Sequence, residues 1–371
     1  MGFLSGIRVI DLSQHGPGSR ASRILADYGA SVVKVERPTH RRAGQIETAS
    51  SAYGGNRGIQ RLRLDLQQAD GQALLLRLAA TADVIIEAFR PGVADRLGIG
   101  ERAVHEVNPR LVYCAITGFG QHGPRADWVG HDLNYAAVTG LLAHTQARAD
   151  GGPPVLGATI GDGAGGGMHA VIAILAALHA RDRTGAGTFL DVAAADGVLW
   201  LMSVMLDQHL DGGLDVGPVR LLTGNFACYN TYRCRDDKWL SVAALEHRFW
   251  RNLCEAIDLP HLVLDHEDES RQTAVIAELQ QCFLTRDRDD WVTRLAAHDT
   301  CVAPVLSIDE VAVDPQVQAR GAVRFGLTTS MLAGSDRDEI APPINLVEAL
   351  DLSPERLAQL TAKGVLEGVV G

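Results

Sequence analysis

The stretch IRVIDLSQHGPGSRASRILADYGASVVKVE, residues 7–36, decides the fold class. Its first six residues are largely apolar, residues 19–29 carry apolar side chains at helical spacing, and residues 31–36 form a second apolar run. Two short apolar runs joined by a helix are typical of the β-α-β unit of a parallel sheet. The sequence therefore predicts an α/β fold that opens with a strand, a helix and a strand.

The same alternation continues along the first half of the chain. Residues 82–89 (ADVIIEAF) and 110–120 (RLVYCAITGFG) are rich in strand-forming residues, and residues 93–108 between them have helical spacing. An apolar helix is predicted over 168–182 and a strand over 188–194. The repeated pattern predicts a large, doubly wound, Rossmann-like domain built on a parallel sheet.

The second half of the chain predicts a smaller α/β domain. Residues 229–245 read as a β-hairpin that turns at Asp236 and Asp237, and helices follow it. The glycine-containing stretch before the hairpin has little periodicity, which is typical of a linker. We predict a large domain of residues 1–205 with 325–371, a linker of 206–224 and a small domain of 225–324.

Composition and charge exclude several classes of protein. The chain of 371 residues carries a net charge of -11, which argues against nucleic acid or an anionic membrane as a partner, because both require a basic face. Its six cysteines form no CxxC pair, so we expect reduced thiols and no metal site. The amino terminus has no charged region followed by a long apolar region, so we expect a cytoplasmic protein.

Two features imitate a dinucleotide-binding fingerprint. Glu36 ends the second strand, where such folds often place an acid that binds ribose, but the loop before it lacks G-x-G-x-x-G. The stretch GDGAGGG, residues 161–167, contains that pattern. However, Asp162 would place a carboxylate beside the pyrophosphate, where like charges repel. Nicotinamide binding is therefore disfavoured.

Two other motifs carry titratable side chains at the start of helical runs. In VGHDLNYAAVTG, residues 129–140, His131 is either a catalytic base or only the polar start of a helix, with Asp132 complementing the helix dipole. In GDGAGGG, Asp162 is either a base or nucleophile, with glycines that admit a ligand to the backbone, or a plain N-cap. These residues alone leave both alternatives open.

Arginines follow the predicted strands. Arg37 follows the second strand, Arg57 lies in GGNRG and Arg90 lies in AFRPGV. In a doubly wound fold the carboxyl ends of the strands bind ligands, so arginines there indicate a phosphorylated ligand. Arg41 and Arg42 also lie nearby, and a solvated surface is an alternative explanation for them.

The ordered combination of these motifs resembles a known family. Residues 4–38, NRG, IIEAFRPGV, GHDLNYAAVTG and IGDGAGGGMHAVIAILAALHARDRTGAGTFLDVAAADG resemble, in this order, the family III CoA-transferase (CaiB/BaiF-type) superfamily. Within it, GHDLNY and the later ALEHRFW are similar to the 2-methylacyl-CoA racemases. The resemblance implies a large doubly wound domain, a small α/β domain and an interlocked homodimer.

The resemblance also implies how the substrate is held. It implies an acyl-CoA thioester substrate and no separate cofactor. By the same resemblance, the CoA portion would be bound by Arg37, Asn56, Arg57, Arg90 and Tyr135.

For catalysis, the resemblance implies His131 and Asp162 as the pair of bases, with Glu246 pairing with the histidine across subunits. Racemisation removes a proton beside the thioester carbonyl and returns one to the opposite face of the planar enolate, so two bases suit it. The enolate oxygen needs donors, and the backbone at Gly161 and Gly163 is the candidate. We therefore expect a racemase that interconverts (R)- and (S)-2-methylacyl-CoA esters.

Three positions depart from the racemase pattern. Ala158 replaces an asparagine that would be a hydrogen-bond partner of the aspartate, His247 replaces a proline, and Ile59 replaces a lysine. One alternative is a CoA transferase, in which Asp162 attacks the acyl-CoA to form an acyl anhydride and His131 is not needed. Another is a non-catalytic CoA-binding protein of the same fold.

Overall fold

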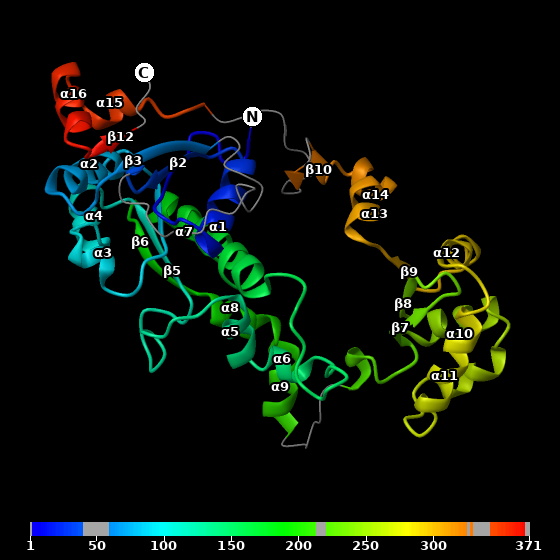
Figure 1. Cartoon of the computed structure of the whole chain (residues 1–371). Coiled ribbons are helices and arrows are strands. Elements are labelled where there is room, and N and C mark those ends of the chain that lie inside the picture. Colours follow the sequence, from blue (N-terminus) through cyan, green and yellow to red (C-terminus); the bar gives the residue numbers. More distant parts are fainter. Residues whose placement is uncertain (1, 40–58, 213–219, 325–326, 329–341, 368–371) are drawn as a thin grey trace. The chain divides into compact units, whose positions relative to one another are not determined.

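The chain folds into two compact units. The computed structural model describes residues 2–39, 59–212, 220–324, 327–328 and 342–367. Unit 1 comprises Met1–Leu141, Val155–Met202 and Ala319–Gly371, and unit 2 comprises Leu142–Pro154 and Ser203–Gln318. Figure 1 labels β2, β3, β5, β6 and β12 of the large sheet in unit 1, and β7, β8 and β9 of a second sheet in unit 2.

Unit 1 contains a seven-stranded sheet in the order β12-β3-β2-β1-β4-β5-β6. Its strands are β1 (Arg8–Asp11), β2 (Ser31–Glu36), β3 (Ile59–Leu64), β4 (Val84–Glu87), β5 (Val112–Thr117), β6 (Thr188–Ala193) and β12 (Leu366–Glu367). All neighbours pair in parallel except β12, which is antiparallel to β3. The predicted large parallel sheet is confirmed. The strand order reverses between β1 and β4, and in such sheets ligands bind beside this point, outside the carboxyl ends of the strands.

Helices cover both faces of this sheet, and alternate residues of each strand enter different cores. Ile10 and Val33 belong to one apolar cluster, whereas their neighbours Val9 and Val32 belong to the other. Burial on both faces explains why the strands appear in the sequence as continuous apolar runs. The helices of unit 1 include α1 (Gly16–Asp27), α2 (Ala69–Ala79), α3 (Val93–Arg96), α4 (Glu101–Val107), α5 (Asp132–Val138), α7 (His169–Thr184), α8 (Ala194–Leu201), α15 (Leu346–Leu350) and α16 (Pro354–Ala362).

A buried polar network fixes the start of α1. The fully buried Asp11 accepts a 2.6 Å hydrogen bond from Lys34 Nζ and further bonds from the hydroxyls of Ser13 and Ser22. Lys34 Nζ also donates to Ser19 Oγ at 2.9 Å. Because a buried charge is tolerated only when it is paired and hydrogen-bonded, this network holds the first turns of α1 against β1 and β2.

One helical run is long and apolar. The π-helix η2 (Gly161–Met168) continues directly into α7, and an 18-residue stretch within this run has a mean hydropathy of 1.4, enough in length and composition to cross a membrane. However, Ala170, Val171 and Ile174 pack in the apolar cluster formed with the sheet. A core helix of a folded domain meets the same criterion, and this packing accounts for the apolar composition.

Unit 2 is built on an antiparallel sheet of β7 (Tyr229–Arg233), β8 (Trp239–Ala243) and β9 (Val302–Val305). Arg233 pairs with Trp239 and Asp237 has a φ of 63°, which confirms the predicted hairpin. The other elements of unit 2 include η3 (Arg220–Thr223), η4 (Pro260–Asp265), α10 (His247–Ala256), α11 (Gln272–Phe283), α12 (Arg288–Leu295) and α13 (Ile308–Val313).

Short elements complete the description. α9 (Ser203–Gly212) occupies the first part of the stretch expected to be an aperiodic linker, where Met, Leu and Gln favour a helix, and residues 213–219 lie outside the described residues. The others are α6 (Leu141–His144), α14 (Pro315–Ala319), β10 (Val323–Arg324) and β11 (Leu327–Thr328).

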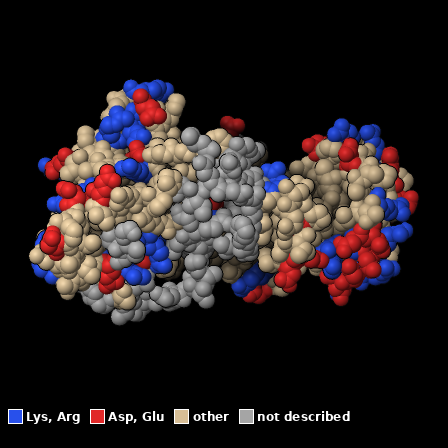
Figure 2. Space-filling view, turned by 90° about the horizontal axis from the view of Figure 1, so that it is seen from above, with Lys and Arg blue, Asp and Glu red and all other residues tan. Residues whose placement is uncertain are grey.

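Charged side chains are mixed rather than separated by sign. On the face drawn in Figure 2, Lys and Arg lie interspersed with Asp and Glu on both units. Elsewhere in the described residues, opposite charges form ion pairs, including Arg181 with Asp83 at 2.7 Å in unit 1 and Arg235 with Asp287 at 2.8 Å in unit 2. The described part of this face therefore presents a mixed charge.

Candidate functional site

His131 stands at the start of α5. It has an extended backbone, and its N–H donates to Asn134 Oδ1 at 3.0 Å, so it does begin the helix. Its imidazole is exposed to solvent. His131 is therefore the first residue of the α5 cap, and it lies where solvent can reach it.

Asp162 lies in the first turn of η2, close to the start of α5. Its backbone N–H donates to Asp132 Oδ1 at 2.8 Å, which joins the two helices directly. Burial raises the pKa of the half-buried Asp162 above its ordinary range, and the carboxylate of Asp132 raises it further, while Arg20 and His131 oppose this shift. The structure thus brings the two sequence-predicted bases within electrostatic reach of each other.

The glycines of GDGAGGG serve mainly to pack helices. A Cβ on Gly165 would lie 2.9 Å from a Val198 side-chain carbon in α8, and one on Gly167 would lie 2.8 Å from Arg20 Cβ in α1. Gly163 has no such neighbour within 4 Å. The other glycines of this stretch are closely packed, so the expected approach of a ligand to the backbone stays a prediction for Gly163 alone.

The backbone donors of this turn already have partners. The Gly163 N–H donates to the Thr159 carbonyl at 2.8 Å, and the Asp162 N–H is held by Asp132. Gly161 is buried and packs against the ring of Tyr135. An oxyanion role for Gly161 and Gly163 stays a prediction, and at Gly163 it would require the bond to Thr159 to be replaced.

Tyr135 forms a wall beside Asp162. Its hydroxyl donates to the Gly130 carbonyl at 2.7 Å, and its ring stacks edge-on to Phe119 at 5.3 Å. Burial, and then the carboxylates of Asp162 and Asp132, raise the pKa of Tyr135 to about 12, so it stays a neutral hydroxyl. Its predicted contact with CoA is not tested by this arrangement.

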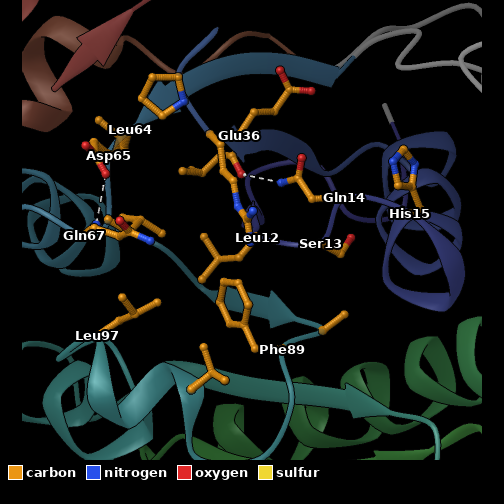
Figure 3. A pocket seen from close by; sticks show the side chains of 16 residues that line it. Leu12, Ser13, Gln14, His15, Glu36, Leu64, Asp65, Gln67, Phe89 and Leu97 are labelled. Atoms are coloured by element: carbon orange, nitrogen blue, oxygen red, sulfur yellow. Dashed lines mark hydrogen bonds between the residues drawn. The ribbon is translucent and has the colours of Figure 1, made fainter. Parts of the chain in front are cut away.

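A cavity of about 340 Å³ lies at the carboxyl ends of β1 to β4, beside the point where the strand order reverses. Figure 3 shows the apolar side chains of Leu12, Phe89 and Leu97 in its wall, with Gln14 and Asp65 among the polar ones. The walls thus combine an apolar surface with a few polar groups, as ligand pockets usually do.

The predicted CoA-binding arginines lie at this edge of the sheet. Arg37 lines the cavity, and the exposed Arg90 follows the lining residue Phe89. Glu36 also lines the cavity, and its buried carboxylate is paired with Arg61 and Arg63. The predicted residues Asn56 and Arg57, like Arg41 and Arg42, lie outside the described residues.

Glu246 lies in unit 2, whereas His131 and Asp162 lie in unit 1. It follows β8 as the N-cap of α10, its carbonyl accepts the Phe249 N–H at 2.9 Å, and its carboxylate is exposed. Burial, and then this carboxylate, raise the pKa of the Cys301 thiol. Glu246 is therefore held through its backbone, while its side chain is exposed to solvent.

Unit 2 contains a second cavity, of about 540 Å³, that the sequence did not predict. Val242 and Ala243 at the end of β8 line it, and Tyr229 and Met205 contribute larger side chains. Because β8 leads directly to Glu246, the cavity and the glutamate lie on one continuous segment. No local sequence pattern marks it, since its lining comes from separate segments.

Comparison with known proteins identifies the family. The sequence pattern of CoA-transferase family III matches residues 4–330. This chain belongs to CoA-transferase family III. The resemblance inferred from the ordered motifs is thereby confirmed.

Relatives within family III have two kinds of named activity. An alpha-methylacyl-CoA racemase from Homo sapiens is 33% identical over 326 residues, covering 86% of this chain and 82% of the relative. An acetyl-CoA:oxalate CoA-transferase from Acetobacter aceti is 32% identical over 336 residues, covering 86% of this chain and 85% of the relative. Identity at this level shows an enzyme family and does not separate the two activities.

The fold of family III is also matched by a solved structure. A CAIB/BAIF family protein from Brucella suis has a TM-score of 0.77 at 26% identity, covering 98% of this chain and 100% of that one. The mixed α/β fold with a large, mainly parallel sheet is therefore shared with this member of the family.

Proposed function

We propose that this family III enzyme is a racemase that interconverts (R)- and (S)-2-methylacyl-CoA esters. The observation that carries the proposal is that the Asp162 N–H donates to Asp132 Oδ1 at 2.8 Å, which brings Asp162 close to His131, the neighbour of Asp132 in the sequence. A CoA transferase that uses an aspartate nucleophile has no use for the histidine. The similarity of the chain to an alpha-methylacyl-CoA racemase supports the same assignment.

The reaction would need no cofactor beyond the CoA of the substrate. One base removes the α-proton beside the thioester carbonyl, the electrons move onto the carbonyl oxygen, and the other base returns a proton to the opposite face. His131 is exposed and Asp162 is half-buried, so the two bases differ in environment as well as in type. Burial and Asp132 hold the pKa of Asp162 up, which makes it a better base for a weakly acidic carbon.

The CoA portion is proposed to occupy the cavity at the ends of β1 to β4, with Arg37 and Arg90 binding its phosphates. Asn56, Arg57 and Tyr135 complete the proposed binding set. Arginine forms paired, charge-assisted hydrogen bonds to phosphate, which suits an overall acidic protein that must hold an anionic ligand.

We also propose the homodimer that the family resemblance implies, with Glu246 of one subunit pairing with His131 of the other. Unit 1 leaves an apolar set on η2, α7 and α8 exposed, including Ile172 (67%), Trp200 (71%) and Leu201 (52%). Single chains rarely expose apolar patches of this kind, so a second copy is a fitting cover.

Incubation with each enantiomer of a 2-methylacyl-CoA in heavy water tests the activity. The wild-type protein is expected to place deuterium at the α-carbon and to produce both enantiomers. His131→Ala and Asp162→Ala should each slow the interconversion of the enantiomers by at least ~10²-fold. Any remaining deuterium exchange should occur with one enantiomer in His131→Ala and with the other enantiomer in Asp162→Ala.

A CoA transferase would give a different result in the same experiment. Transfer of CoA to a free carboxylate, without α-proton exchange and with an acyl group on Asp162 that hydroxylamine traps, would overturn the racemase proposal. The transferase is the second candidate because a CoA-transferase is among the similar proteins. In that case His131→Ala would leave most of the activity.

A further inference from the structure

Arg20 of α1 reaches the segment directly before η2, the helix that carries Asp162. Its Nη2 donates a 2.7 Å hydrogen bond to Thr159 Oγ1, across 139 residues of sequence. The Thr159 carbonyl in turn accepts the Gly163 N–H at 2.8 Å. The guanidinium is therefore connected to both sides of Asp162 in the sequence, through the residue three before it and the residue after it.

The position of Arg20 is fixed by its own helix. Ser19, its neighbour, is held by Lys34 in the buried network with Asp11. Arg20 Cβ packs against Gly167, and a Cβ on Gly16 would lie only 3.7 Å from Asp162 Oδ2. The first turns of α1 therefore form one wall around the Asp162 carboxylate.

The charges that face Asp162 come from two helices. α5 contributes His131, Asp132 and the neutral Tyr135, and α1 contributes Arg20. α8, which packs on the other side of η2, presents Val198 and the Ala194 carbonyl. Asp132 disfavours an ionised Asp162, and both Arg20 and His131 favour it.

Of the two cationic side chains near Asp162, only Arg20 keeps its positive charge throughout the reaction. His131, if it is one of the two bases, loses and gains a proton in every cycle and is a cation for only part of it. An arginine is protonated at every working pH. Arg20 is therefore the constant positive charge near Asp162 among the groups that act on it in the described structure.

We propose that Arg20 is a positioning residue for Asp162: it fixes the first turn of η2 through Thr159, and its permanent charge keeps the Asp162 carboxylate ready to accept the α-proton. This inference rests on the proposed function. It assigns Arg20 no contact with the reacting carbon.

The test compares Arg20→Met with Arg20→Lys, which keeps the charge, and with Thr159→Val, which removes only the hydrogen bond. Deuterium exchange is measured against pH for each enantiomer separately. Without the cation, the pKa of Asp162 rises, so in Arg20→Met the acidic limb for the enantiomer that faces Asp162 should move to higher pH. Below that limb, kcat should fall about tenfold per pH unit, as a single ionisation requires.

Controls separate this role from a structural one. In Arg20→Lys the acidic limb of the pH profile should return to its wild-type position. Thr159→Val should lower kcat without moving this limb. In all variants the acidic limb for the other enantiomer should stay where it is in wild type. The proposal would be overturned if the acidic limb lay at the same pH in Arg20→Met and wild type, or if the variant changed KM alone. A change in Tm would not alter this conclusion.

Failure of the proposed function has a different signature. If the wild-type protein exchanges no α-proton but transfers CoA, the proposed racemase activity is wrong. The positioning role of Arg20 can still be tested in that case. The same variants would then be compared through the pH dependence of acyl trapping on Asp162 by hydroxylamine, and an unmoved acidic limb there would also overturn the role of Arg20.

Discussion

Gly197→Ala probes the packing that positions Asp162. Gly197 lies in α8 against the backbone of η2, and a Cβ built on it would lie 2.6 Å from Gly165 Cα and closer still to the Gly165 carbonyl oxygen. Both contacts are to backbone, so no side chain can rotate away. The added methyl must push α8 away from the helix that carries Asp162.

The expected size follows from this geometry. Overpacking of a tight interior costs about 1–3 kcal/mol, and a backbone contact places this variant near the upper value. For a unit of this size each kcal/mol lowers Tm by about 2–4 °C, so about 3 kcal/mol predicts a fall of about 6–12 °C. Thermal melting followed by circular dichroism measures it.

Gly163→Ala is the matched control. It lies in the same helix, but a Cβ there would have no heavy atom within 4 Å. Since alanine favours a helix over glycine by about 1 kcal/mol, its Tm should stay level or rise. If Gly197→Ala melted within about 2 °C of wild type, or if Gly163→Ala lost as much stability, the reasoning about close helix packing would be refuted.

Three further predictions concern other parts of the chain. Arg90→Ala should raise KM for CoA esters about tenfold or more with little change in kcat, because a hydrogen bond to a charged group contributes about 1.5–3 kcal/mol of binding; a loss of kcat at unchanged KM, seen in initial rates, would contradict its place at the nucleotide. Glu310→Gln should lower Tm at neutral pH, since hydrogen bonds from Arg288 and Lys238 hold the pKa of Glu310 far below its usual range. This stabilisation is complete above the unfolded carboxyl pKa of about 4.3 and fades as pH falls toward the lower folded value, so melting curves of variant and wild type should converge in acid. Sedimentation should show a dimer at micromolar concentration, and a stable folded monomer there would count against the interlocked assembly.

Much of the fold could be predicted because its causes are local. The β1 and β2 strands, Arg8–Asp11 and Ser31–Glu36, are buried on both faces, so each appears as an apolar run beside a helical segment. The hairpin of unit 2 was marked by two turn-forming aspartates. By contrast, Leu366–Glu367 adds an antiparallel strand to the edge of the sheet through pairing with β3, and two residues carry no period from which to predict it.

The candidate site divides in the same way. His131 and Asp162 could be singled out because each is a titratable residue in an unusual local motif. Arg20 could not, since it sits in an ordinary helical segment and its partner Thr159 is 139 residues away. Nor could the cavity of unit 2, whose lining residues are brought together only by folding.

The glycine-rich stretch GDGAGGG shows why a motif needs its physical setting. Its letters satisfy a phosphate-binding pattern, yet Gly165 and Gly167 lie where α8 and α1 approach too closely for a side chain. A phosphate loop would instead direct free N–H groups outward, whereas here the Asp162 and Gly163 N–H groups are held by Asp132 and Thr159. The same spacing of glycines therefore lets η2 pack closely against α1 and α8 and leaves the Asp162 carboxylate beside the first turn of α1, which suits the proposed proton transfer better than the binding of an anion.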